Sequence, residues 1–291
     1  MLFQLNRHVV WNMNNKFVQF SGLLKLFSVI YTLRQFKTYV LIAFALLVLF
    51  NETVTADESI LKMTTGAEYT TGDFGGTQSI DEWYVPFTTT YTADRYTFRL
   101  TVPYIRVTAP EGTVQTDGTI LPGTGTRTTE SGIGDVIAGV SYRDAFNSEV
   151  TSGTAVDFTA KVKFGTADVN KGLGTGENDY TIQAELYNYY DRLMSFGILG
   201  YKFRGDPPGI NLSDSLLIFV GGNYRLTSSL KAGLDFYFQE ALFSGIADQK
   251  ELTAFLGYRL SNTQYLRGYL IQGFGDASPD WGVGVMITIR Q

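Results

Sequence analysis

The chain has 291 residues, a formal net charge of −5 and no cysteine. Its length allows one large domain or two of average size, and the lack of cysteine excludes a disulfide framework and thiolate chemistry. The acidic balance, without a cluster of Lys and Arg, argues against a nucleic-acid partner.

The beginning of the chain predicts export. Positive charge precedes the apolar run YVLIAFALLVLF, and Val54 and Ala56 take the −3 and −1 positions of a cleavage site. This order is typical of a secretory signal peptide, and the run is shorter than the roughly 20 apolar residues of a transmembrane helix. An uncleaved membrane anchor is the alternative. The predicted organisation is an N-terminal extension over 1–36, which lies outside the protein if translation starts later, a signal peptide over 37–56 and one folded unit over 57–291.

Loss of residues 1–56 also removes His8, the only histidine of the chain. Without His and Cys, the folded unit lacks the usual bases, nucleophiles and metal ligands of these types. An enzyme would then need a Ser–Lys or carboxylate pair. Asp157 and Lys161 have the spacing to share a strand face, but nothing singles them out as such a pair. We therefore predict no catalytic site and no cofactor.

Apolar and polar residues alternate along the rest of the chain, which is typical of β-strands with two different faces. In the segment LKAGLDFYFQ, for example, Leu230, Leu234 and Phe238 share one face, whereas Lys231 and Asp235 share the other. Phe255 interrupts the polar face of a similar segment. The predicted strands are 60–70, 80–91, 95–107, 133–144, 153–164, 179–189, 195–204, 214–226, 229–240, 250–260, 263–273 and 281–290.

Two architectures use such strands, a soluble sandwich and a transmembrane barrel. The barrel is favoured because segments of about ten residues match a tilted span of the bilayer. Aromatic residues near the segment ends also match interfacial girdles; they are Trp83, Tyr91, Tyr104, Tyr142, Tyr180, Tyr201, Tyr224, Tyr258 and Trp281. We predict an all-β fold, an antiparallel up-and-down transmembrane β-barrel of about twelve strands.

The links between strands alternate in length. Short links such as Thr227-Ser228 predict periplasmic turns, and long links at Thr108 to Ser131, Gly165 to Asn178 and Gly205 to Ser213 predict external loops. Pro103 lies within a strand, where it removes a ladder donor and predicts a bulge. A lateral opening for hydrophobic solutes is the alternative at Pro103.

Several segments, in this order, resemble a known family: SGIGDVIAGVSYR, KVKFGTADVNKGLGTGENDY, GYKF, GGNYRLTSSLKAGLDFYF and LGYRLSNTQYLRGYLIQGFGDASPDWGVGVMITIR. The resemblance is to the bacterial outer-membrane family labelled "MetA-pathway of phenol degradation", a transporter-type barrel family, and it covers roughly residues 60 to 290. It implies passage of small, often aromatic or hydrophobic, molecules. Barrels of this kind commonly end in an aromatic residue, whereas this chain ends in Gln291, which bears on its insertion.

Charged residues on the polar strand faces are the candidate lumen lining. In lipid, each Arg or Lys near the midplane would cost about 2–4 kcal/mol, so these side chains must point inward or lie at the rims. Two interpretations stay open: the charges pair across the lumen and plug it, or they line a pathway that selects solutes. The candidates are Asp135, Arg143, Asp157, Lys161, Lys163, Glu185, Lys202, Arg225, Lys231, Asp235, Glu251, Arg259 and Arg290.

The stretch GLGTG at 172–176 invites a phosphate-binding interpretation, which the surrounding residues exclude. A P-loop would continue with Lys and Ser or Thr, and a dinucleotide fingerprint would need a third Gly where Glu177 stands. We predict a long strand connection whose glycines permit positive φ. No metal site is predicted; a cation at this loop would have Asp168, Glu177, Asn178 and Asp179 as its candidate ligands.

Together these features predict a channel or facilitator in the outer membrane of a Gram-negative-type cell, for passive passage of small molecules. Its predicted partners are outer-membrane lipid, the barrel-assembly machinery and a small-molecule solute. The alternatives are a closed structural or adhesive barrel that conducts nothing and, in third place, an enzyme embedded in a barrel.

Overall fold

The computed structural model describes residues 59–110, 114–116, 119–121, 127–145, 152–243 and 245–291. The predicted N-terminal extension, 1–36, and signal peptide, 37–56, lie outside the described residues. In the described part of the chain, no helix is long and apolar enough to cross a membrane.

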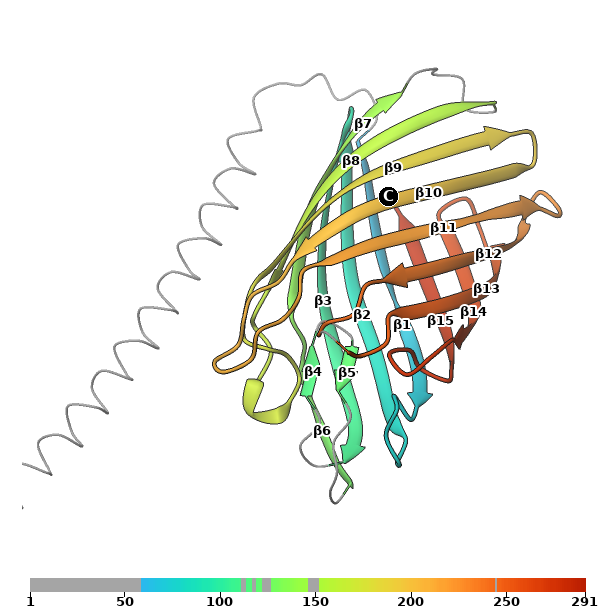
Figure 1. Ribbon diagram of the computed structural model, residues 1–291. Helices are drawn as coiled ribbons and strands as arrows, with labels where there is room; N and C mark the ends of the chain where they lie inside the picture. Colours follow the sequence, from blue (N-terminus) through green and yellow to red (C-terminus); the bar gives the residue numbers. More distant parts are fainter. Residues whose placement is uncertain (1–58, 111–113, 117–118, 122–126, 146–151, 244) are drawn as a thin grey trace, which may run out of the picture. The chain divides into compact units, whose positions relative to one another are not determined.

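Antiparallel strands make up nearly all of the described structure (Figure 1). The barrel strands are β1 (Ile60–Gly72), β2 (Ile80–Ala93), β3 (Tyr96–Pro110), β6 (Arg127–Ile133), β7 (Val136–Ala145), β8 (Ser152–Phe164), β9 (Asp179–Tyr190), β10 (Leu193–Phe203), β11 (Ser215–Arg225), β12 (Leu230–Gln239), β13 (Gln249–Arg259), β14 (Gln264–Gly273) and β15 (Trp281–Arg290). A short hairpin, β4 (Val114–Thr116) and β5 (Thr119–Leu121), lies between β3 and β6, and a single 3₁₀ turn, η1 (Val169–Lys171), lies between β8 and β9.

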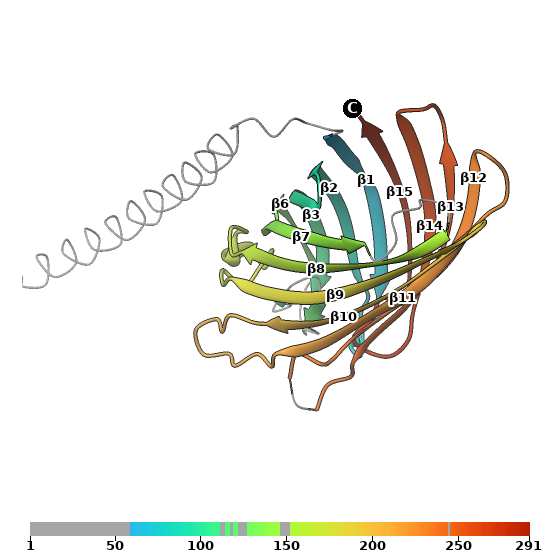
Figure 2. The same cartoon turned by 90° about the horizontal axis from the view of Figure 1, so that it is seen from above.

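The strands close into a barrel, which Figure 2 shows from above. From β7 to β15 each strand pairs with the next in sequence, and β15 pairs with β1. The pairings of β1 with β2, of β2 with β3, and of β3 with β6 and β7 complete the ring. Because β6 and β7 both pair with β3 and follow each other along it, they form one interrupted wall strand. The wall therefore has twelve antiparallel strands, which confirms the predicted fold class.

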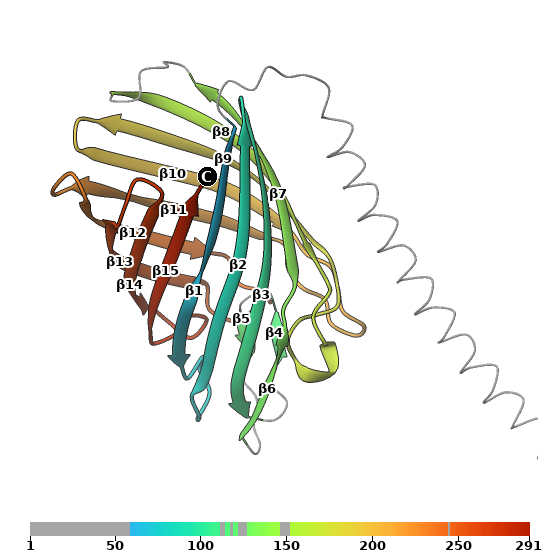
Figure 3. The ribbon, with the colours of Figure 1, turned by 180° about the vertical axis from the view of Figure 1, so that it is seen from behind.

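The two ends of the barrel differ. The connections 73–79, 165–178, 204–214, 240–248 and 274–280 leave from one end, here called the loop end. The other end, the turn end, carries short links and both ends of the barrel sequence, where Leu61 and Gln291 exchange backbone hydrogen bonds of 2.8 and 3.2 Å. Figure 3 shows β1 and β15 side by side from behind. This alternation agrees with the predicted up-and-down topology.

Two of the turns are two residues long, and both begin with aspartate. Asp94 between β2 and β3 has φ 51°, and Asp191 between β9 and β10 has φ 48°. Two-residue hairpins need positive φ because their twist must match that of the strands, and aspartate tolerates this region better than most residues. The sequence thus fixes the register at these corners locally.

A β-bulge interrupts the wall beside Pro103, as predicted. Thr101 pairs with Ile137 and Tyr104 with Ile133, so the three residues 134–136 face only two residues of β3. Gly134 N–H donates to the Pro103 carbonyl at 2.9 Å, and Val136 N–H donates to the hydroxyl of Thr166 at 2.9 Å. Two of the backbone donors at the bulge therefore have acceptors, one of them on a loop residue.

One predicted loop is shorter than expected. The connection from Thr108 to Ser131 was predicted as irregular, whereas β3 continues to Pro110 and β6 starts at Arg127. The two strands pair up to Pro110 and Arg127, and the hydroxyls of Thr108 and Thr129 lie 2.9 Å apart. Threonine on both strands favours continued pairing, but this segment lacks the alternation of apolar and polar residues from which the strands were predicted.

The outer face is apolar and has aromatic residues at both ends. Leu199, Leu256 and Leu270 are 56%, 57% and 62% exposed although they lie within strands. All the aromatic residues named as girdle candidates share this outward register. Trp83 and Trp281 flank Tyr69 at the loop end, with ring centroids 5.2 and 5.6 Å from it. An apolar band between aromatic girdles is the surface that a bilayer requires.

Candidate functional site

The barrel interior is the candidate site, because the outer face of the strands is apolar and their polar side chains line the interior. It holds a cavity of about 280 Å³ near the loop end. Residues from well-separated strands line this cavity, including Glu68, Tyr84, Ile137, Glu251 and Ile271. These residues mark the inner face, and the pairing registers then show which residues of each strand share it.

The registers place all the charged residues predicted from the sequence on this inner face. They are Asp135, Arg143, Asp157, Lys161, Lys163, Glu185, Lys202, Arg225, Lys231, Asp235, Glu251, Arg259 and Arg290. Their burial differs: Asp157, Lys163 and Asp235 are buried, whereas Arg225 and Arg259 are exposed at the turn end. That these residues line a solute pathway belongs to the proposal below.

Near the loop end, Lys163 joins two carboxylates. Its ammonium lies 2.9 Å from Asp135 Oδ2 and 3.3 Å from Asp179 Oδ2, and all three side chains are buried. The other oxygen of Asp135 accepts the N–H of Ala167 at 2.9 Å, and that of Asp179 accepts the N–H of Gly205 at 3.1 Å. The cluster thus fastens two loops, 165–178 and 204–214, to the inner wall.

The wall formed by β7, β8 and β9 carries a hydrogen-bonded polar network. Glu185 accepts from Thr159 at 2.7 Å and from the Tyr187 hydroxyl at 2.5 Å. Arg143 binds Asp157 with two hydrogen bonds of 2.8 Å each. These contacts hold side chains against the wall on which they originate, so they order the lining without spanning the bore.

The wall formed by β12 to β15 combines charge with aromatic rings. Arg267 lies 3.0 Å from Asp235, and its guanidinium stands 4.1 Å from the ring centroid of Phe255. Tyr269 donates to Glu68 at 2.6 Å. A Cβ on Gly284 would collide with the Tyr269 ring, and one on Gly233 would collide with Phe255. Glycines on the inner face therefore let large rings lie flat along the wall.

A row of aromatic rings crosses the inner face of β9 to β12, and sequence reasoning missed it. Tyr187, Phe196, Phe219 and Tyr237 follow one another with centroid separations of 6.3, 5.0 and 6.1 Å. We call these four residues the aromatic row. The signal was present, because Phe196 shares its strand face with Ile198 and Phe219 lies opposite Ile198, but the inner face was expected to be polar. The lining therefore combines a polar network on β7 to β9, the aromatic row on β9 to β12 and a wall of charges and rings on β12 to β15.

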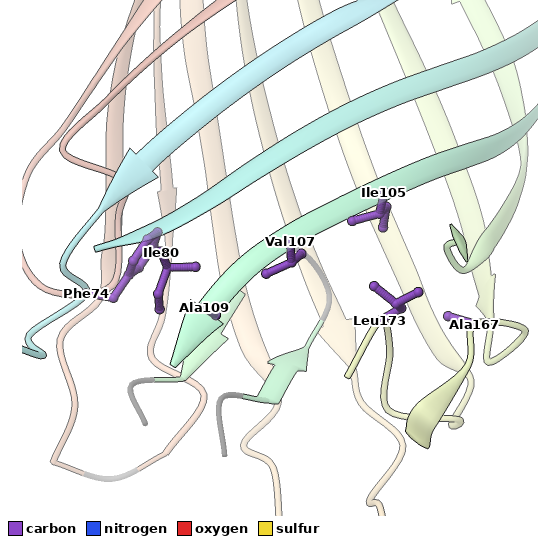
Figure 4. Close-up of a cluster of buried hydrophobic side chains, with 7 residues drawn as sticks. All are labelled: Phe74, Ile80, Ile105, Val107, Ala109, Ala167 and Leu173. Atoms are coloured by element: carbon purple, nitrogen blue, oxygen red, sulfur yellow. The ribbon is translucent and has the colours of Figure 1, made fainter. Parts of the chain in front are cut away.

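A hydrophobic cluster narrows the loop end (Figure 4). Phe74 and Leu173 from two different loops pack with the inward-facing residues Ile105 and Val107 of β3, and all four are at most 7% exposed. Ile80, Ala109 and Ala167 complete this group, which we call the loop-end cluster. Burial of apolar loop residues inside the mouth, away from the lipid face, makes it a constriction.

The glycine-rich stretch forms part of this constriction and does not gather its acidic residues. Asp168 caps η1, where its side chain accepts from Asn170 N–H, and Asn178 accepts from Gly165 N–H at 3.0 Å. Asp179 binds Lys163 and Gly205, and the backbone N–H of Glu177 donates to the hydroxyl of Thr175 at 3.2 Å. Among the described residues, no three acidic or histidine side chains lie together as metal ligands. Gly172 and Gly176 have φ 64° and 77°, in line with their expected role as turn residues.

Comparisons with known proteins support the fold. No family model and no curated protein matches the chain. Among solved structures, the COG4313 outer membrane channel from Pseudomonas putida F1 matches 80% of this chain and 94% of its own, with a TM-score of 0.59 and 11% identity. The NanC porin matches 78% of this chain and 98% of its own, with a TM-score of 0.51 and 10% identity.

The chain has the fold of outer-membrane β-barrels. Identities this low show the fold alone. The resemblance to the MetA-pathway family gains no support from a family model, so the specific family stays a prediction.

Proposed function

We propose that the chain is an outer-membrane channel through which small molecules pass by diffusion. The observation that carries the proposal is the inverted surface: leucines outside are more than half exposed, while charged residues line an interior that encloses a cavity. The similarity in fold to an outer membrane channel and a porin supports the same function. The proposal involves no catalytic step.

The proposal includes the surroundings of the barrel. The apolar band would face outer-membrane lipid, the signal peptide over 37–56 would direct export, and the barrel-assembly machinery would insert the chain.

We further propose that the solutes have an apolar or aromatic surface. The aromatic row offers successive ring faces and edges along one wall, and aromatic pairs are worth about 0.5–1.5 kcal/mol beyond their buried area. Two of its members are held in place: Tyr187 donates to Glu185, and Tyr237 donates to Gln239 at 2.9 Å. Replacing Phe219 by Ala would remove the ring between two neighbours and weaken retention of aromatic solutes; Phe236, which faces outward on β12, provides the control position.

The loop-end cluster would act as the gate. Solutes from the loop side must pass Phe74 and Leu173, which close on β3. The same cluster favours the second candidate, a closed barrel that conducts nothing, because a fully packed loop end would block solute passage. The two candidates differ in whether loosening this cluster changes conduction.

Planar-bilayer conductance of the purified protein separates the two. The channel proposal expects conductance in the wild type and greater open probability for Leu173→Ser, because Leu173 is 2% exposed in the cluster. Val169→Ser is the matched control, since Val169 belongs to the same loop and is 53% exposed. Sealed bilayers for both wild type and Leu173→Ser would refute the channel and leave the closed barrel.

A further inference from the structure

The charges of the inner face are unevenly distributed along the barrel axis. Three lysines, Lys161, Lys163 and Lys202, lie toward the loop end. The other basic residues gather toward the turn end of their strands: Lys62, Arg99, Arg143, Arg225, Lys231, Arg259, Arg267 and Arg290. Five acidic residues lie toward the loop end, namely Glu68, Glu82, Asp135, Asp179 and Glu251, whereas Asp157, Glu185 and Asp235 lie near the middle of their strands. The acidic group includes three glutamates that line the cavity, and Lys163 neutralises part of it.

Two basic pairs at the turn end stand directly opposite each other. Lys62 is the cross-strand partner of Arg290, and Arg225 is the partner of Lys231, with all four side chains on the inner face. Directly opposed like charges destabilise a sheet. Lys62 also lies within electrostatic reach of Arg99 and Arg143, both of which repel it.

Carboxylates neutralise only part of this basic group. Asp157 binds Arg143, and Asp235 binds Arg267. Among the described residues, no carboxylate forms an ion pair with Lys62, Arg99 or Arg290, whose side chains are exposed toward the bore. The repulsion between these basic side chains destabilises the fold, so a contribution to stability does not explain why they lie so close together. An anion bound between them would relieve the repulsion.

We propose that the turn-end half of the lumen is a binding subsite for small organic anions such as carboxylates, and that the axial separation of charge makes the channel rectify. The inference deepens the proposed function, on which its conduction part rests. Arg143 and Tyr187 place the subsite next to the aromatic row, with the guanidinium 6.0 Å from the ring centroid. An aromatic carboxylate would then stack on the row and direct its charge to the basic group.

The direction of rectification follows from the arrangement. With the loop side positive, cations enter through the acidic half and anions through the basic half, so both accumulate in the lumen and current is high. Reversed polarity depletes both halves. Screening limits the effect, since the Debye length is about 10 Å at 0.1 M salt and about 3 Å at 1 M. Rectification is therefore expected at 0.1 M KCl and should vanish at 1 M.

Conductance of a charge variant and a matched control tests the rectification. Lys62→Gln/Arg99→Gln should abolish it, whereas Arg106→Gln should leave it intact, since Arg106 lies on the same strand as Arg99 but faces outward. The chain has no cysteine, so an Asn170→Cys change in the exposed η1 segment, treated with an impermeant thiol reagent on one side, reports which way the barrel inserted. A linear current at 0.1 M KCl, or equal effects of the two changes, would overturn the charge-separation inference.

A binding measurement keeps the subsite testable without conduction. Titration calorimetry on the detergent-solubilised protein should show benzoate binding about tenfold more tightly than the neutral benzamide, which corresponds to one charge-assisted hydrogen bond. Lys62→Gln/Arg99→Gln should erase this preference and Arg106→Gln should keep it. Equal affinities for benzoate and benzamide in the wild type would overturn the anion subsite. Sealed bilayers together with selective benzoate binding would refute the channel and leave the subsite standing.

Discussion

Replacement of Lys163 by Met is expected to destabilise the barrel and release two loops. The ammonium of Lys163 lies between two buried carboxylates, 2.9 Å from Asp135 and 3.3 Å from Asp179. Through these carboxylates it is connected to the backbone of Ala167 and Gly205. Met keeps the length and apolar stem of the side chain, so the change removes the charge and little else.

The size of the loss follows from the partners that remain. Removing one member of a buried ion pair typically costs about 3–5 kcal/mol, because a charge is left buried and uncompensated. Here each carboxylate keeps one backbone N–H donor, which offsets part of that penalty. We therefore expect a loss near the lower bound, about 3 kcal/mol in the free energy of unfolding.

Urea titration of the protein in lipid vesicles, with the folded fraction measured by its faster migration on an unboiled gel, tests this expectation. Lys161→Met is the control: Lys161 is two residues away on the same face of β8 and has no ion pair among the described residues. Its replacement should cost less than about 1 kcal/mol. Adding Asp135→Asn and Asp179→Asn to Lys163→Met should restore most of the loss. Equal unfolding midpoints for Lys163→Met and Lys161→Met would refute the reasoning.

Two further predictions concern the two faces of the wall. Gly284→Val should lower the free energy of unfolding by about 1–3 kcal/mol, because the new side chain displaces Tyr269. Gly268→Val should be neutral or stabilising, since Gly268 faces outward and no atom lies near the position of its Cβ. Equal urea midpoints for the two variants would contradict this prediction. Leu199→Lys should lower the free energy of unfolding by about 2–4 kcal/mol, since it puts a charge into lipid. Ile198→Lys, one residue away on the inner face, should lower it by less. The reverse order in vesicle unfolding would mean that the inner and outer faces are wrongly assigned.

Much of the wall was predictable because each strand carries its own periodicity. The alternation in LKAGLDFYFQ places Lys231 and Asp235 inward without knowledge of the neighbouring strands, and the structure has them there. Pro103 predicted a bulge from the chemistry of one residue. These features depend on local sequence, which is why single-chain reasoning reached them.

The missed features depend on register, which links residues far apart in sequence. Asp179 was considered as a cation ligand, yet it is the cross-strand partner of Lys163 and pairs with that ammonium. The aromatic row was missed for a different reason. Phe196 and Phe219 fit the two-residue periodicity of their strands. Inner faces were expected to be polar, so these two apolar residues were not predicted to line the lumen.

The sorting of charge along the axis also needed the barrel. Lys62 and Arg290 lie at opposite ends of the folded unit in sequence, and only the pairing of β1 with β15 brings them together. Arg290 was among the charges predicted to face inward, whereas Lys62 was not. Once strand order and direction are known, the ends at which these charges lie follow directly.

The most direct test of the account is the conductance of the purified protein in planar bilayers, measured on a preparation that migrates as a folded barrel on an unboiled gel. A channel predicts stepwise current increments that grow in frequency when Leu173 is replaced by Ser. Bilayers that stay sealed at every voltage, with wild type and variant both folded, would contradict the account.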